Sequence, residues 1–227
     1  MSGLTCSRKN SPAATRPPLD DETIAGVTVD LELADLLSHG QDLWDAIGAR
    51  DELWGGIPSG PFATQHDFLN WLSDRIGRSD QRAYAIIDKA GGGRVAAGLF
   101  FLLQVKPDMG TAEIGLVYGP GLSRTVGGTE AVYRLAQYVL ETGGYRRLEW
   151  RCGPDNPASM RAAERYGFTY EGTMRQTYWL KGHNWDTRIY SILDSEWPPI
   201  GARFEAWLAP ENFNDAGRQI KGLSEFR

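Results

Sequence analysis

The chain has 227 residues, of which 41% are apolar and 23% are charged, and its formal net charge is −5. This length allows one domain with tails or two small domains, and the apolar content is sufficient for a substantial core. The acidic balance argues against non-specific nucleic-acid binding, which normally needs a basic surface. No apolar run reaches the length of a membrane span.

The cysteines and histidines indicate neither a disulfide framework nor a metal site. Cys6 and Cys152 are far apart in the sequence, and two such cysteines do not form a framework. His39, His66 and His183 have no metal-ligand spacing, so we expect no metal. The N-terminal segment lacks the apolar core of a secretory signal, and we therefore expect a cytoplasmic protein.

The first third of the chain predicts one strand and two helices. Residues 1–22 are rich in Ser, Pro, Ala and Asp and predict a disordered leader. Alternating apolar residues over 27–33 predict a first strand, and a helix is expected from Asp35 to Ile47. A loop dense in glycine, proline and aromatic residues, 53–62, precedes a second helix, which begins near Thr64 and ends near Gly77.

Strands and helices are mixed in the remainder of the chain. We expect two strands around a glycine turn over 83–104, a strand over 111–118, a helix over 129–142, a strand over 146–152, a helix over 157–166 and two strands over 170–193. This order predicts an α/β or α+β sheet with helices on its faces. Residues 201–227 are expected to form a tail, in which Phe204, Trp207 and Leu208 could dock as a short helix.

The segment 113–140 combines a strand, a glycine-bearing loop and a helix. A loop that enters a helix presents unpaired backbone N–H groups and the positive end of the helix dipole, and glycine allows a phosphate to approach the backbone. The loop has neither the Gly-Lys-Ser/Thr of a Walker motif nor the spacing of the dinucleotide fingerprint. A tight turn that binds nothing remains the alternative.

A second motif lies downstream, where Asn156, Ser159, Gly167 and Phe168 form the pattern N-x-x-S-x-x-x-x-x-x-x-G-F. Together with the glycine loop, this pattern resembles the GNAT superfamily of acyl-CoA N-acyltransferases, and above all its Rim-type ribosomal-protein N-terminal acetyltransferases and their uncharacterised relatives. The resemblance covers roughly residues 24–197. It implies a GNAT domain over 23–200, with a mixed, mostly antiparallel sheet of six or seven strands, splayed, with helices on both faces, and acetyl-CoA as the cosubstrate.

The resemblance also implies where acetyl-CoA binds. The family's pyrophosphate loop reads Gln/Arg-x-x-Gly-x-Gly/Ala; Arg124 and Gly127 match it, whereas Thr129 replaces the small residue and could cap the helix instead. The strand backbone before the loop would hold the pantetheine arm and polarise the thioester carbonyl, and the Asn156 amide would also hold that arm. The implied cofactor-binding residues are Leu116, Val117, Tyr118, Arg124, Thr125, Val126, Gly127, Gly128, Thr129 and Asn156.

Two residues are candidates for the proton transfers. Family members often protonate the departing thiolate with a tyrosine four residues after the Ser159 position, where this chain has Ala163. The Rim-type subgroup uses the serine itself, so we assign the acid role to Ser159 and rank Tyr166, a turn further along the helix, lower. Glu113 is the candidate base, because an amine acceptor arrives as an ammonium ion and must lose a proton. A solvated or salt-bridged glutamate is the alternative.

The sequence does not identify the acceptor. Loop 53–62 resembles the segment that walls the acceptor site in this subgroup, so Trp54 and Phe62 are candidate substrate-binding residues; aromatic packing under a long loop is the alternative. The aromatic loop favours a small primary amine over a protein N-terminus, and a non-catalytic acyl-CoA sensor is a third possibility. Arg161 and Arg165 could meet the 3′-phosphate of the cofactor or be ordinary surface charges. We expect a monomer or homodimer without nucleic-acid or membrane partners.

Overall fold

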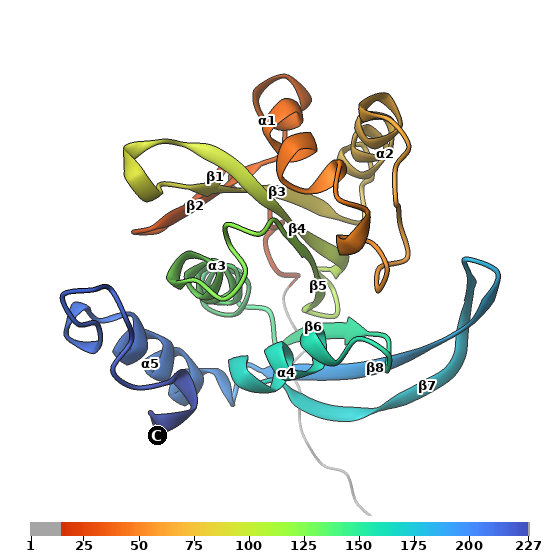
Figure 1. Cartoon of the computed structure of the whole chain (residues 1–227). Helices are drawn as coiled ribbons and strands as arrows, with labels where there is room; N and C mark the ends of the chain where they lie inside the picture. The colour runs from red at the N-terminus through yellow and green to blue at the C-terminus, as the bar shows by residue number, and fades with distance from the viewer. Residues whose placement is uncertain (1–14, 227) are drawn as a thin grey trace, which may run out of the picture.

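The computed structural model describes residues 15–226, and over this range the strands form one eight-stranded sheet in the order β1-β2-β3-β4-β5-β6-β8-β7 (Figure 1). Neighbouring strands are antiparallel except for β5 and β6, which are parallel. The predicted mixed, mostly antiparallel sheet is confirmed, with one strand more than the expected maximum. The strands are β1 (Thr23–Ala25), β2 (Val29–Leu33), β3 (Arg82–Asp88), β4 (Val95–Lys106), β5 (Thr111–Tyr118), β6 (Arg147–Cys152), β7 (Thr169–Leu180) and β8 (His183–Leu193).

The helices lie on both faces of the sheet, as the sequence predicts (Figure 1). Helices α1 and α2 cover one face of β2–β5 and enclose one apolar cluster, and α3 packs on the other face within a second cluster. The helices are α1 (Leu36–Leu43), continued by a π-helical turn (Trp44–Gly48); α2 (Gln65–Ile76); α3 (Val126–Gln137), continued by a π-helical turn (Tyr138–Thr142); α4 (Pro157–Tyr166); and α5 (Trp197–Leu208).

Side-chain caps set the beginnings of these helices. The Asp35 carboxylate accepts hydrogen bonds from the first-turn N–H groups of α1, and Thr64 Oγ1 accepts one from Asp67 N at 3.2 Å. Gly167 ends α4 in the left-handed region, with φ of 93°, which glycine adopts without steric cost. The predicted cap at Thr129 is wrong, because α3 begins one turn earlier and Thr125 caps it through a 3.1 Å bond from Gly128 N to Thr125 Oγ1.

Both ends of the described chain pack against the domain. Residues 1–14 lie outside the described residues, but residues 15–22 do not match the expected disordered leader: Leu19 is 1% exposed, and the Tyr145 hydroxyl donates to the Pro17 carbonyl at 3.3 Å. At the other end, α5 crosses the predicted boundary at residue 200, and its Phe204 is fully buried. We call residues 197–226 the C-terminal segment.

The sheet opens between its two central strands. The pairing of β5 with β6 runs from Thr111 opposite Arg147 to Ile114 opposite Trp150, and beyond that point β5 continues beside β4 while β6 continues beside β8. The register of this pairing is continuous. The splay predicted for the sheet is therefore present, and it arises where the parallel pairing stops.

Because Leu19 is buried, replacing it should destabilise the whole domain. Leu19→Ala is expected to lower the free energy of unfolding by about 2–5 kcal/mol, through lost burial and a residual cavity. Leu37→Ala is the matched control, because Leu37 is 97% exposed, and it should change stability little. Denaturant unfolding measures both; equal effects of the two variants would show that residues 15–22 are not part of the core.

Candidate functional site

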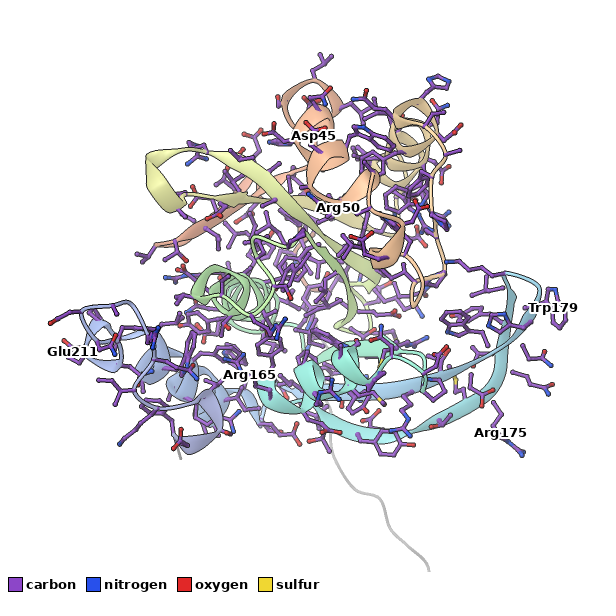
Figure 2. The ribbon with its side chains drawn as sticks, viewed as in Figure 1. Asp45, Arg50, Arg165, Arg175, Trp179 and Glu211 are labelled. Atoms are coloured by element: carbon purple, nitrogen blue, oxygen red, sulfur yellow. The ribbon has the colours of Figure 1, made fainter. Side chains whose placement is uncertain are left out.

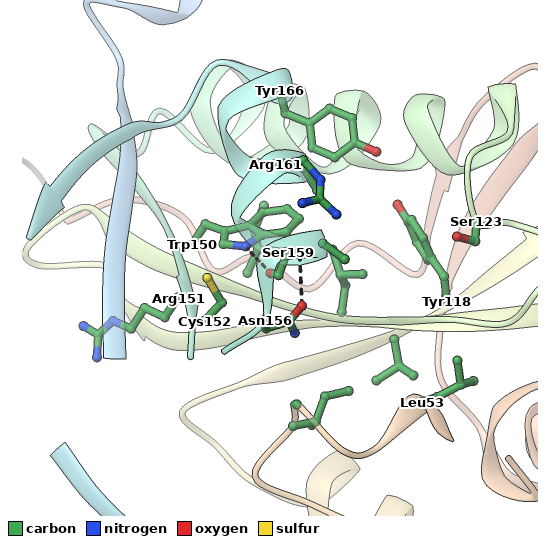
Figure 3. Close-up of a pocket in the computed structure, with 18 of the residues that line it drawn as sticks. Leu53, Tyr118, Ser123, Trp150, Arg151, Cys152, Asn156, Ser159, Arg161 and Tyr166 are labelled. Atoms are coloured by element: carbon green, nitrogen blue, oxygen red, sulfur yellow. Dashed lines mark hydrogen bonds between the residues drawn. The ribbon is translucent and has the colours of Figure 1, made fainter. Parts of the chain in front are cut away.

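A cavity of about 1550 Å³ occupies the splay between β5 and β6 (Figure 3). Its walls come from the loop after α1, from α2, from the first turns of α3 and α4, from the β7–β8 hairpin and from the C-terminal segment. We distinguish two parts. The α3 end is lined by Ser123–Val126, Thr129, Arg161 and Arg165, and the hairpin end by Trp71, Arg75, Glu113, Arg151, Tyr178 and Trp185.

At the α3 end, the loop and the helix N-terminus present backbone to the cavity. Arg124 has a positive φ of 62°, and it lines the cavity together with Thr125 and Val126. Gly127 and Gly128 face the interior instead: a Cβ on Gly127 would lie 2.9 Å from Val29 Cγ1, and one on Gly128 would collide with the Leu122 carbonyl oxygen. The two glycines therefore let the first turn of α3 pack closely on the core.

Arginine side chains surround this helix N-terminus. Arg165 donates from Nη1 to Thr129 Oγ1 at 3.2 Å, and its guanidinium lies over the Trp207 ring at 5.3 Å, so it bridges α4, α3 and the C-terminal segment (Figure 2). Arg161 reaches from α4 into the cavity (Figure 3). Arg218 lines the same cavity from the C-terminal segment. Positive side chains and a helix N-terminus together suit an anionic ligand.

The C-terminal segment forms part of the cavity wall, which the sequence did not predict. Trp207 Nε1 donates to Gln219 Oε1 at 3.0 Å, and both residues line the cavity. Asn212, only 6% exposed, holds the same segment by donating to the Trp207 and Lys221 carbonyls. The spacing of Phe204 and Trp207 indicated a docked helix, but no sequence motif indicated that the following residues reach the cavity.

In the middle of the cavity, Asn156 and Ser159 are locked together at the start of α4 (Figure 3). Asn156 Oδ1 accepts from Ser159 N at 3.0 Å, which caps the helix and leaves the amide nitrogen to donate elsewhere. Trp150 Nε1 donates to Ser159 Oγ at 2.9 Å, so the serine hydroxyl keeps its own hydrogen to donate, and the Cys152 sulfur is one acceptor within its reach. Burial raises the pKa of the neighbouring Cys152 thiol, which keeps it neutral.

The predicted strand residues Leu116, Val117 and Tyr118 all line the cavity beyond the point where β5 leaves β6. The Tyr118 hydroxyl donates to the Gly128 carbonyl at 2.6 Å and ties the strand to α3. Tyr166 projects toward the same region from the far end of α4 (Figure 3), and burial raises the pKa of its hydroxyl. Ser159 and Tyr166 thus occupy different parts of the cavity.

At the hairpin end, Glu113 is both ion-paired and open to the cavity. Its carboxylate lies 3.2 Å from Arg151 Nε, and its side chain is 14% exposed. Burial raises the pKa of Glu113; the Arg151 guanidinium opposes this rise, and the nearby Glu149 carboxylate adds to it. Arg151 is shared, because its Nη2 also lies 2.7 Å from Glu149. Glu113 can therefore be a salt-bridge partner of Arg151 and still be the candidate base.

The two predicted acceptor residues differ in position. Trp54 lines the cavity, but its side chain is fully buried and donates from Nε1 to the Ile47 carbonyl at 2.9 Å. Phe62 packs edge-on against Trp54, with ring centroids 4.9 Å apart, and is not among the cavity-lining residues of the described chain. Trp71 and Arg75 of α2 line the cavity in front of them, and the sequence analysis missed both.

The β7–β8 hairpin closes one side of this end. Figure 1 shows it curving toward the loop after α1, and Lys181 Nζ donates to the carbonyl oxygens of Trp54 at 2.6 Å and Ser59 at 3.2 Å. Trp185 lines the cavity, whereas Trp179 points outward and is 69% exposed (Figure 2). The hairpin end is thus bordered by two segments that lie far apart in the sequence.

Among residues 15–226, none of the helices combines the length and apolar character needed to cross a bilayer. Within the same range, no group of three or more His, Cys, Asp and Glu side chains is placed to hold a metal ion.

Comparisons with known proteins agree with this architecture. The family model of the acetyltransferase (GNAT) domain matches residues 38–169. A GCN5-related N-acetyltransferase from Brucella melitensis is 40% identical with a TM-score of 0.88, over 94% of this chain and 98% of that one. A probable GNAT-family acetyltransferase from Chromobacterium violaceum is 35% identical with a TM-score of 0.79, over 87% of this chain and 99% of that one.

Among curated proteins, the ribosomal-protein-serine acetyltransferase of Escherichia coli is 31% identical over 105 residues, which is 44% of this chain and 56% of that protein. The chain thus spans about half the length of the curated relatives it matches. The GNAT model, by contrast, covers more than half of the chain, including β5, α3 and most of the cavity between β5 and β6. The chain therefore belongs to the GNAT acetyltransferase family.

Proposed function

We propose that the protein transfers an acetyl group from acetyl-CoA to the primary amine of a small molecule. The observation that carries this proposal is the cavity in the splay, which joins the N-terminus of α3 at one end to the partly buried Glu113 carboxylate at the other, with the Ser159 hydroxyl between them. The family is one of acetyltransferases, and these groups suit the parts of acetyl-CoA in that order.

The α3 end suits the nucleotide part of the cofactor. The N–H groups of Val126 and Gly127 in the first turn of α3 would bind the pyrophosphate, since a helix leaves its first donors without intrahelical partners, whereas Gly128 N already donates to Thr125 Oγ1. Arg161, Arg165 and Arg218 line the cavity around this turn, and guanidinium groups bind phosphate oxygens through paired hydrogen bonds. They would hold the 3′-phosphate, which favours the ligand role of Arg161 and Arg165 over ordinary surface charge.

The middle of the cavity suits the pantetheine arm and the thioester. The backbone of Leu116–Tyr118 would pair with the arm, and the Asn156 amide nitrogen would bind it as well, because its Oδ1 is used as a helix cap. A backbone N–H of this strand would donate to the thioester oxygen as negative charge develops there. The acetyl group would then lie between Ser159 and Glu113.

These residues would carry out the two proton transfers. Glu113 takes a proton from the ammonium form of the acceptor, and the free amine attacks the thioester carbonyl carbon. A C–N bond forms and the C–S bond breaks. Ser159 donates a proton to the departing sulfur and takes up the second proton of the attacking nitrogen, so the products are the amide, the thiol of CoA and a protonated Glu113. The Ser159 hydroxyl is oriented for this by the bond that it accepts from Trp150. Holding amine and thioester together in one cavity supplies much of the rate.

The closed hairpin end favours a small acceptor. The Lys181 bonds hold the hairpin against the loop after α1, which narrows the space available to a folded protein. Similarity to the Escherichia coli enzyme favours the other candidate, a protein N-terminus, but that similarity covers 44% of this chain.

Incubation with acetyl-CoA and a mixed library of small amines and N-terminal peptides, read by mass spectrometry, tests the proposal. We expect acetylated small amines and little acetylated peptide, because the hairpin end is bordered on both sides. Acetyl-CoA should also raise the melting temperature, since it binds the native state. Preferential acetylation of peptides would establish the second candidate, and stabilisation by acetyl-CoA without any acetylated product would indicate a sensor.

Glu113→Gln should change the shape of the pH–rate profile. Because burial raises the pKa of Glu113, kcat/KM of the wild type for the amine should begin to fall, with decreasing pH, at a higher pH than for an ordinary glutamate. The variant cannot accept a proton, so its rate should follow the free-amine fraction and rise about tenfold per pH unit below the pKa of the amine. The profile is measured at saturating acetyl-CoA.

Glu149→Gln is the matched control, because Glu149 also pairs with Arg151. It should keep the wild-type profile shape, with the fall in rate displaced to lower pH, because the Glu149 carboxylate that helps to raise the pKa of Glu113 is gone. Parallel profiles for Glu113→Gln and the wild type would exclude the base role and leave Glu113 as a salt-bridge partner.

Ser159→Ala should lower kcat by roughly 10- to 1000-fold while acetyl-CoA still raises the melting temperature, as expected for loss of a general acid. The substitution also leaves Trp150 Nε1 without its acceptor, so Trp150→Phe is needed as a control. That variant removes the same hydrogen bond but keeps the hydroxyl, and its kcat should fall less. Equal losses in both variants would show that the hydrogen bond, rather than proton donation, accounts for the effect.

A further inference from the structure

Arg75 is a cation at the hairpin end that the proposed reaction does not use. It lines the cavity from α2, its guanidinium lies 5.8 Å from the Trp71 ring centroid, and its Nη2 donates to Ser59 Oγ at 3.3 Å. Within residues 15–226, none of the ion pairs includes Arg75, although its neighbour Arg78 has two. One weak hydrogen bond leaves most of the five guanidinium N–H donors available.

The sheet register places Arg75 and Glu113 over the same region. Leu103 of β4 lies opposite Glu113 of β5, and opposed residues of an antiparallel pair share one face of the sheet. Trp71 packs on Phe101, two residues before Leu103 on that face, with ring centroids 5.7 Å apart. Arg75 follows Trp71 by one helical turn.

Hydrogen bonds at the end of α2 show which part of β4 lies next to the helical turn that carries Arg75. Gln81 Nε2 donates to the Arg75 carbonyl at 2.5 Å, and the Asp80 carbonyl accepts from Val105 N at 3.2 Å. The C-terminal turn of α2 therefore lies toward the Leu103–Val105 end of β4, which is also the end opposite Glu113. Arg75 and Glu113 both line the cavity there.

The hairpin end is consequently dipolar. Glu113 lies on one side, where it shares Arg151 with Glu149, and Glu149 pairs with Arg147 as well. Arg75 lies on the other side and makes no ion pair within residues 15–226. Partial burial, and then the nearby Arg78, lower the pKa of Arg75, and the Asp74 and Asp80 carboxylates oppose this fall. A simple ammonium ion would pair with Glu113 but would make no ion pair with Arg75.

We propose that the acceptor is an amino acid, whose α-carboxylate pairs with Arg75 while its α-amino group faces Glu113. This rests on the proposed acetyl transfer to a small amine. The fork of a guanidinium matches a carboxylate through two parallel hydrogen bonds. Trp71, Phe101, Tyr178 and Trp185 line the space around the two charged groups, so the side chain of the amino acid is apolar.

The bonds that form and break are those of the proposed acetyl transfer. The α-nitrogen bonds to the acetyl carbon and the C–S bond of the thioester breaks. One proton of the α-ammonium group passes to Glu113, and a second passes by way of Ser159 to the sulfur, which leaves as the thiol of CoA. The product is an N-acetyl amino acid, whose carboxylate stays on Arg75 until release. A residue at a protein N-terminus has its α-carboxyl in a peptide bond, so it cannot make this pair.

The test compares each amino acid with its own α-amide. Phenylalanine, leucine, methionine and tryptophan are assayed beside phenylalaninamide, leucinamide, methioninamide and tryptophanamide, with the wild type, Arg75→Gln and Arg75→Lys. Arg78→Gln is the matched control, since Arg78 lies one turn from Asp74, pairs with it at 3.9 Å and has a 48% exposed side chain. Melting temperatures report whether each variant is folded.

Arg75→Gln should lower kcat/KM for the preferred amino acid about 10- to 100-fold, the scale of a lost charge-assisted hydrogen bond, and change that of its amide less than about threefold. The loss in kcat/KM for the amino acid is divided by the loss for its amide, and this quotient cancels the difference in amine pKa between the two substrates. Arg75→Lys should restore part of the loss, because it keeps the charge but not the fork, and Arg78→Gln should change neither substrate.

Calorimetry of the same pairs, with CoA present, separates this inference from the proposed function. One outcome is that the acids bind, the amides do not, Arg75→Gln abolishes the binding, and no acetyl group is transferred. This outcome would support the Arg75 site and overturn the transferase proposal. Equal use and equal binding of acids and amides across the panel, or equal losses in Arg75→Gln, would overturn the inference, whether or not other amines are acetylated.

Discussion

The early end of the hydrogen bonding between β5 and β6 is the constraint on which the remaining structure depends. The two strands pair only from Thr111 to Ile114 on one side and from Arg147 to Trp150 on the other. Each strand keeps its outer neighbour beyond that point, so the opening does not disorder the sheet. It leaves backbone donors and acceptors without strand partners inside a cavity, where a ligand can satisfy them. A pantetheine arm is a chain of amides and suits that position.

Glu113, Glu149 and Arg151 lie beside the opening, and their arrangement bears on two requirements for a base that usually conflict. A base that acts near neutrality needs a raised pKa, which burial supplies, but a buried carboxylate without a partner is costly. Glu113 pairs with Arg151, which also pairs with Glu149, and the pKa of Glu113 is nevertheless raised, first by burial. The sharing keeps the charge in place and still leaves the carboxylate able to take up a proton.

Local signals in the sequence predicted the elements and much of the site, whereas long-range contacts were not predictable. The predicted helix starts at Thr64 and near residue 157 depend on neighbouring residues, and α2 and α4 begin there. That Asp35 and Asn156 cap their helices was not predicted. Lys181 bonds to a carbonyl 127 residues away, and no periodicity carries such information. The close packing of the α3 glycines was not predictable either, because the same residue type serves close packing and close phosphate approach.

Because of the Lys181 bonds, the width of the hairpin end depends on both the hairpin turn and the loop after α1. The ammonium group holds the hairpin turn to two carbonyl oxygens of the loop after α1, so neither wall can shift without the other or without breaking those bonds. Lengthening the turn, or changing the loop by a residue, would alter the space beside Glu113 although no residue in contact with the acceptor had changed. Closely related proteins with identical cavity residues can therefore differ in the size of acceptor that they admit, and the difference would be found in the turn and the loop.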